Sequence, residues 1–72
     1  MTNNEKSILV LSTFPASISV KDIAEKLVNE KLAACINIIP EVQSVFRWKD
    51  KVDNVPENIL IIKTTLNLYD IL

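Results

Sequence analysis

The sequence predicts an α+β fold of the ferredoxin-like type, whose elements follow the order βαββαβ. Apolar runs rich in branched residues, Ser7–Thr13 and Ile59–Thr65, indicate strands, and a 3.6-residue apolar period after Ser19 indicates a helix. A long alternating segment, Glu41–Lys49, lies between that helix and the later strand. This order corresponds to the βαββ(α) part of the fold, a sheet with helices packed on it.

The first strand and the helix are predicted from apolar spacing. Ser7–Thr13 is a short apolar run, so we expect a central strand that is buried on both faces. Ser19 and Asp22 have the spacing of a capping box at a helix N-terminus. The helix should end between Lys31 and Ala33. One face of it carries apolar residues at helical spacing: Val20, Ile23, Ala24, Leu27 and Val28.

The middle of the chain predicts a long hairpin. Cys35–Ile39 is a branched apolar strand that Pro40 interrupts. Beyond it the pattern alternates, so that one face should carry Val42, Ser44, Phe46 and Trp48. Because the chain contains no glycine, we expect Asp50–Asn54 to form a longer loop and not a tight primed turn.

The last third predicts a strand and the start of a helix. Ile59–Thr65 is the clearest strand and should pair antiparallel with the preceding one. Asn67 and Asp70 have the spacing of an N-cap and its capping-box partner, which indicates the first turn of a helix. We therefore expect residues 1–72 to form a single domain that is incomplete at its C-terminal end.

Size and composition favour self-association. A folded monomer of 72 residues buries roughly 62% of the surface that its unfolded chain exposes. The favourable free energy of burying apolar surface and the unfavourable loss of conformational entropy then nearly cancel, at about 110 kcal/mol each. One cysteine and no histidine leave little room for a disulfide or a structural zinc site. Association with further copies is the remaining source of stability.

Composition also bears on location and partners. The polar start, with Glu5 and Lys6, does not resemble a secretory signal, and the single cysteine suits a reducing compartment, so we expect a cytoplasmic protein. No apolar run is long enough to span a membrane. A net charge of −1 offers no long-range attraction to nucleic acid or to an anionic membrane, and we expect neither partner.

Candidate chemical groups are few. Without histidine the chain has no side chain that titrates near neutrality in its ordinary range, so we predict that it is not an enzyme. Cys35 is the only soft metal ligand, and its alternative role is that of a buried, inert strand residue. Four acidic residues lie near the hairpin without calcium-loop spacing and are predicted to be solvated: Glu41, Asp50, Asp53 and Glu57.

Aromatic and cationic residues alternate at the end of the hairpin. Such a pattern occurs on single-strand nucleic-acid platforms. On a regular strand, however, Phe46 and Trp48 face one way while Arg47 and Lys49 face the other, so stacked bases would not meet those cations. We therefore favour packing of the aromatic rings in the core or at an interface.

Several separated motifs resemble the CutA family of divalent-cation tolerance proteins. The resemblance spans nearly the whole chain and includes an opening strand, ILVLST, with a proline two residues after Thr13. It rests further on KLAACINIIP (Lys31–Pro40), Ser44, Phe46, Trp48, Glu57 and IIKTT (Ile61–Thr65). Members of this family are similar to PII signalling proteins in fold, and the resemblance implies a ferredoxin-like, PII-like subunit that forms a stable homotrimer through its long hairpin strands.

The resemblance also implies a link to copper, with departures. The family's copper ligands include a cysteine in the first strand and a histidine, whereas this chain has Ser12 at the first position and no histidine. The family's tyrosine is Phe46 here, and its glycine after the tryptophan is Asp50. The resemblance places Trp48, Glu57 and Lys63 near the cleft between subunits, where they would hold a small ligand or pack against a neighbour.

Two functional hypotheses follow. The first is a non-enzymatic homotrimer associated with divalent-metal tolerance and binding, chiefly of copper, with no obligatory cofactor and with Cu²⁺ or another divalent cation as its ligand. The second is a PII-like signalling scaffold that binds a small anion or metabolite beside Lys63 in the cleft between subunits.

Overall fold

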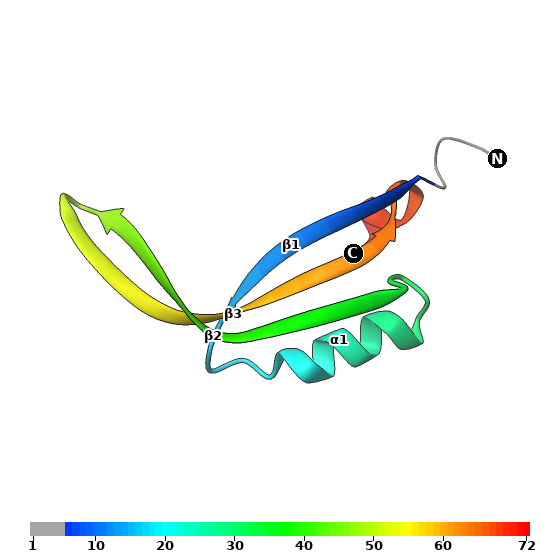
Figure 1. Ribbon diagram of the computed structural model, residues 1–72, viewed down its shortest axis with the longest axis horizontal. Coiled ribbons are helices and arrows are strands. Elements are labelled where there is room, and N and C mark those ends of the chain that lie inside the picture. The colour runs from blue at the N-terminus through cyan, green and yellow to red at the C-terminus, as the bar shows by residue number, and fades with distance from the viewer. Residues whose placement is uncertain (1–5) are drawn as a thin grey trace.

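The computed structural model describes residues 6–72. The polar start, Met1–Glu5, on which most of the expectation about a secretory signal rests, lies outside the described residues. The elements follow the predicted order and form an elongated molecule of 48 × 24 × 16 Å (Figure 1). They are β1 (Ser7–Pro15), α1 (Val20–Asn29), β2 (Cys35–Trp48), β3 (Lys51–Thr65) and a 3₁₀ helix, η2 (Leu66–Ile71).

The three strands form one antiparallel sheet in the order β1-β3-β2. The expectation that the first strand is central and buried on both faces is therefore wrong for the described sheet, because β3 is central and β1 lies at the edge. Leu9 and Leu11 of β1 are 67% and 71% exposed. A short apolar run indicates two apolar faces, but it cannot say whether the second face is covered by this chain.

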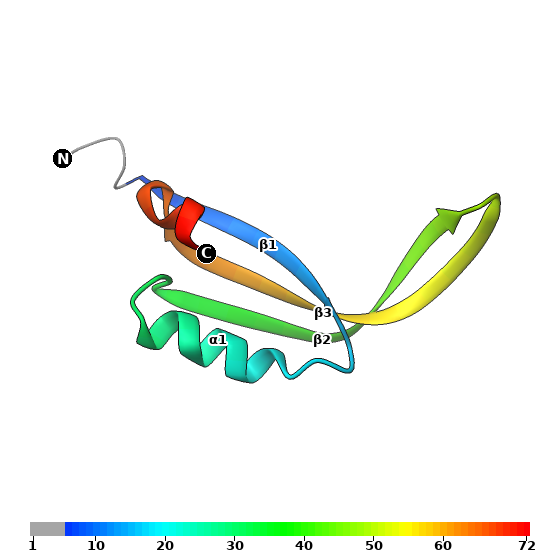
Figure 2. The same ribbon diagram turned by 180° about the vertical axis from the view of Figure 1, so that it is seen from behind.

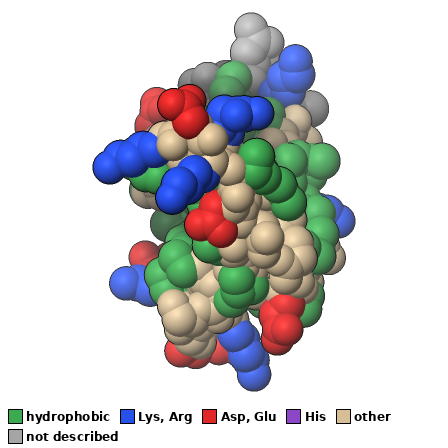
Figure 3. All heavy atoms as spheres, turned by 90° about the vertical axis from the view of Figure 1, so that its left-hand side faces the viewer, with side chains coloured by type: hydrophobic (Ala, Val, Ile, Leu, Met, Phe, Trp, Pro, Cys, Tyr) green, Lys and Arg blue, Asp and Glu red, His purple; other side chains and the backbone are tan. Residues whose placement is uncertain are grey.

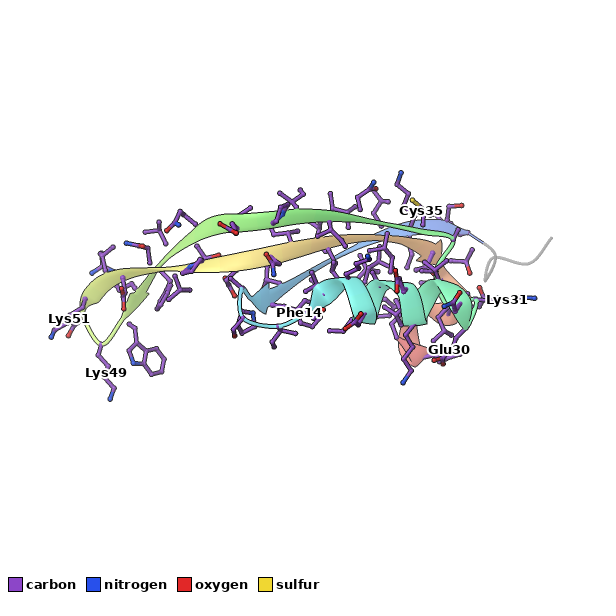
Figure 4. All side chains as sticks on the ribbon, turned by 90° about the horizontal axis from the view of Figure 1, so that it is seen from below. Phe14, Glu30, Lys31, Cys35, Lys49 and Lys51 are labelled. Atoms are coloured by element: carbon purple, nitrogen blue, oxygen red, sulfur yellow. The ribbon has the colours of Figure 1, made fainter. Side chains whose placement is uncertain are left out.

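One face of the sheet is covered and holds the core. Both α1 and η2 lie on this side of the sheet (Figures 2 and 4). Leu60 in the middle of β3 is completely buried. The residues packed around it come from every element before η2: Val10, Phe14, Val20, Ile23, Leu27, Ala33, Ile36 and Ile62. Within residues 6–72, no helix is long and apolar enough to cross a membrane.

The two longer strands continue beyond β1 as a two-stranded arm, made of Gln43–Trp48 and Lys51–Pro56 (Figure 1). Only Lys49 and Asp50 connect them, with φ angles of 49° and 64°. The expectation of a longer loop is thus wrong: the connection is a two-residue turn of the primed type, built without glycine. Aspartate tolerates this left-handed conformation better than most residues do.

The helix ends differ in detail from the capping pattern. The Ser19 hydroxyl donates a hydrogen bond to the Asp22 carboxylate at 3.1 Å, and no side chain caps the backbone of α1. At the other end of the chain, the residue preceding η2 is Thr65, whereas the sequence predicts Asn67 as the cap. The Asn67 side chain instead accepts a hydrogen bond from the Thr65 hydroxyl.

Candidate functional site

The face of the sheet opposite α1 is largely apolar, and nothing within residues 6–72 covers it. Side chains alternate along β3, so that the residues between the buried positions point to this second side, the open face. Pairing places neighbours from β1 and β2 in rows across it. The open face consists of Leu9, Leu11, Thr13, Cys35, Asn37, Ile39, Ile59, Ile61 and Lys63.

All three predicted cleft residues fall on strand positions that alternate toward this side, although the arm that carries Trp48 turns away from the sheet (Figure 1). Glu57 and Lys63 are an even number of positions apart on β3 and so belong to the same alternating set. Trp48 pairs with Lys51, which belongs to that set as well. Glu57 lies six positions after Lys51, and Lys63 lies six positions after Glu57, which corresponds to about 20 Å for each interval. Within one chain the three side chains therefore cannot meet around one small ligand.

Trp48 lies at the far end of the arm and is 65% exposed. The ammonium group of Lys49 lies 6.0 Å from the centre of its ring, within the range of a cation–π contact. The sequence-based view that the neighbouring cations face away from the aromatic rings is therefore wrong for Lys49, because the turn brings it back over Trp48. Packing of Trp48 in the core of this chain is also ruled out.

The end of the arm carries charges of both signs. Figure 3 looks along the molecule from this end and shows Lys and Arg side chains interspersed with Asp, Glu and hydrophobic ones. The cations Arg47, Lys49 and Lys51 stand close in sequence to Asp50 and Asp53. Such a mixture does not produce the single-sign surface by which proteins attract the phosphate backbone.

Cys35 begins β2 and is exposed, so the expectation of a buried thiol is wrong (Figure 4). It pairs with Lys63 across the sheet. Among residues 6–72, no three thiolate or carboxylate groups cluster in a way that could hold a metal ion. Copper favours imidazole and sulfur ligands, and one thiol beside an ammonium group does not fit that preference. The described residues thus do not form a copper site by themselves.

Two of the hollows beside α1 join three or more segments of the chain, and the sequence predicts neither. One, of about 620 Å³, lies where β1 begins and β3 ends. The other, of about 600 Å³, lies between α1 and η2 over the sheet, and its lining includes Phe14 and Tyr69. Each joins residues from three or more segments of the chain, and a pattern within one segment carries no signal for such a meeting.

These features define part of a ferredoxin-like fold with one covered face, one open face and a projecting arm. The model of the CutA1 divalent ion tolerance protein family matches residues 8–72. The chain is 41% identical over 61 residues to the divalent-cation tolerance protein CutA of Thermus thermophilus, which is 85% of this chain and 59% of that protein. This chain belongs to the CutA1 family.

Solved structures agree. The crystal structure of CutA1 from Oryza sativa superposes with a TM-score of 0.85 at 41% identity, covering 97% of this chain and 64% of that one. CutA from Synechococcus elongatus, in a complex with a Bis-Tris molecule, gives a TM-score of 0.81 at 30% identity, covering 93% and 61%. The chain spans 35–59% of the length of the first curated relatives that it matches.

Proposed function

We propose that this chain is a subunit of a non-enzymatic protein that serves tolerance to divalent metal ions, copper foremost. Membership of the CutA1 family carries this proposal, since the family and the Thermus thermophilus relative are both named for it.

The exposed, unpaired thiol of Cys35 suits a reducing compartment, and we propose a cytoplasmic location. Fractionation of cells that express the tagged protein would contradict this location if the protein were found outside the cytoplasm.

We further propose that the subunits assemble as a homotrimer through the open face and the arm. Monomeric proteins rarely leave a contiguous apolar area of this kind in contact with water. The small core supports the same proposal, because few side chains are fully buried in one copy. The number three comes from the resemblance to the PII-like trimers. Native mass spectrometry of the full chain tests it directly: a trimer is expected, and a monomer at micromolar concentration contradicts it.

Metal binding on this proposal needs ligands from another copy or from outside residues 6–72, because Cys35 stands alone as a soft ligand. Calorimetric titration of the full chain with Cu²⁺ should show saturable binding. If a Cys35→Ser variant loses it, Cys35 is a ligand in the assembly; if the variant retains it, the ligands lie elsewhere. Absence of binding by the full chain would overturn the copper part of the proposal.

A second function is favoured by the position of three side chains. Trp48, Glu57 and Lys63 stand far apart along the hairpin of β2 and β3, so they can line one ligand site only if different copies contribute them. We propose that this cleft between subunits binds a small anion or metabolite and acts as a PII-like signalling scaffold. The Bis-Tris complex of the Synechococcus elongatus relative supports binding of small molecules by the family.

Thermal-shift screening distinguishes this second function from the first. A ligand of the cleft should raise the melting temperature through mass action, and the rise should disappear in Lys63→Gln. Lys21→Gln is the matched control, since Lys21 is an exposed lysine on α1. A shift that survives in Lys63→Gln, or the absence of any hit among metabolites and nucleotides, argues against the cleft.

A further inference from the structure

Asn58 is a polar side chain in an apolar layer. It is 7% exposed and occupies the covered side of β3, in alternation with Leu60 and Ile62. Its Oδ1 atom accepts a hydrogen bond from the backbone N–H of Glu41, with 3.0 Å between the heavy atoms. A buried amide without a partner is costly, so this bond explains how Asn58 can lie here.

The partner strand is irregular at this position. Ile39 pairs with Ile59 and Val42 pairs with Glu57, so Pro40 and Glu41 together stand opposite the single residue Asn58. This is a β-bulge, in which two residues face one. Pro40 has no N–H to give to the ladder, and Glu41 adopts a left-handed φ of 52°. The Asn58 side chain provides the acceptor for the backbone N–H of Glu41.

The bulge lies where the sheet narrows to the arm. β1 ends at Pro15, which pairs with Glu57, the residue of β3 immediately before Asn58. Beyond this point the ribbon has only two strands and turns away from the plane of the sheet (Figures 1 and 2). We propose that Asn58 is a positioning residue: its hydrogen bond to Glu41 fixes the bulge and thereby the direction in which the arm leaves the sheet.

The direction of the arm determines where Trp48 is presented. A ribbon held in one direction before subunits meet loses less conformational freedom on association than a ribbon that swings. The effect on assembly rests on the proposed trimer, whereas the effect on the arm concerns one chain alone. The two parts can therefore be tested separately.

Pulsed dipolar spectroscopy measures the arm's direction. Spin labels are attached to Glu25→Cys on the solvent side of α1 and to Val52→Cys on the arm, in a Cys35→Ser background. Labelled chains are diluted with unlabelled ones, so that only distances within one chain are recorded. The parent should give one narrow distance distribution. Asn58→Leu, which has a similar shape and no acceptor, should broaden it.

Two variants serve as controls. Asn58→Asp keeps an acceptor oxygen at the same place and should restore the narrow distribution. Thr64→Val removes another buried side-chain hydrogen bond from the same side of β3, the one that Thr64 donates to the Leu32 carbonyl at 2.7 Å. It should lower stability and leave the distribution narrow. The proposal is overturned if Asn58→Leu leaves the distribution narrow, if Thr64→Val broadens it equally, or if Asn58→Asp does not restore it.

Assembly gives the second measurement. If the proposed trimer exists, the concentration at which half of the Asn58→Leu subunits are assembled should rise by up to about tenfold, because each subunit must then order its arm on association. An unchanged midpoint together with a broadened arm would refute the link to assembly and keep the positioning role. A parent chain that stays monomeric would refute the trimer and leave the result for the arm intact.

Discussion

The turn at the end of the arm provides a sharp test of the backbone argument. Lys49 and Asp50 both adopt positive φ, and Asp50 has the larger value, 64°. A residue with a Cβ atom pays about 1–2 kcal/mol for the left-handed conformation, and aspartate pays at the low end. Glycine pays nothing there but loses about 0.5–1 kcal/mol more unfolded-state freedom. The difference between the two terms is small, so Asp50→Gly should stabilise the fold by up to about 0.5 kcal/mol.

For a chain of this size a gain of about 0.5 kcal/mol corresponds to a rise in melting temperature of about 2–4 °C. Calorimetry or circular dichroism measures it, at one fixed subunit concentration because assembly would also shift the transition. Asp53→Gly is the matched control, since it removes the same charge from the extended part of β3. There glycine should destabilise by about 0.5–1 kcal/mol. Equal shifts in both variants, or a lower melting temperature for Asp50→Gly, would refute the reasoning.

Three further predictions concern the two faces of the sheet. Leu60→Ala empties the centre of the core and should cost about 2–5 kcal/mol in denaturant unfolding; a loss below 1 kcal/mol contradicts the assigned core. Leu11→Lys should leave the circular dichroism spectrum unchanged but dissociate the assembly in native mass spectrometry, whereas Val52→Lys on the arm should dissociate it less. Cys35 should react slowly with a thiol reagent in the assembly and faster on dilution; a rate independent of concentration would place Cys35 outside any interface.

Elements with a strong local period could be predicted from the sequence. The helix predicted after Ser19 is α1, and the alternation before Trp48 correctly predicts an extended strand. The interruption at Pro40 is confirmed as a bulge. These features depend on neighbouring residues only, so the sequence contains all the information that they require.

Features that depend on distant segments could not be predicted in the same way. The run of apolar residues in Ser7–Thr13 would look the same in a central strand and in an edge strand with an open apolar face. Only the order of the strands in the sheet, in which β3 is central, decides between the two. Cys35 is exposed for the same reason, since its side of the sheet is not covered by this chain. The sequence predicts a longer loop because the chain has no glycine, whereas Asp50 tolerates the positive φ that the tight turn requires.

The candidate site was predicted only through the family resemblance. Trp48, Glu57 and Lys63 have no local pattern in common, and their place in one alternating set of strand positions follows from the register of β2 against β3. The role of Asn58 had no signal at all in the sequence, because its partner, Glu41, is 17 residues away.

The alternation along β3 makes this strand sensitive to a particular kind of genetic change. Residues 58, 60, 62 and 64 supply the interior of one copy, while the residues between them form the open face. Insertion or deletion of one codon within this stretch would exchange the two sets, and would spoil folding and association together. The same change at the Lys49–Asp50 turn would only alter a loop. In a library of single-codon insertions and deletions, variants changed at the end of the arm should therefore still fold, whereas variants changed within Asn58–Thr64 should not.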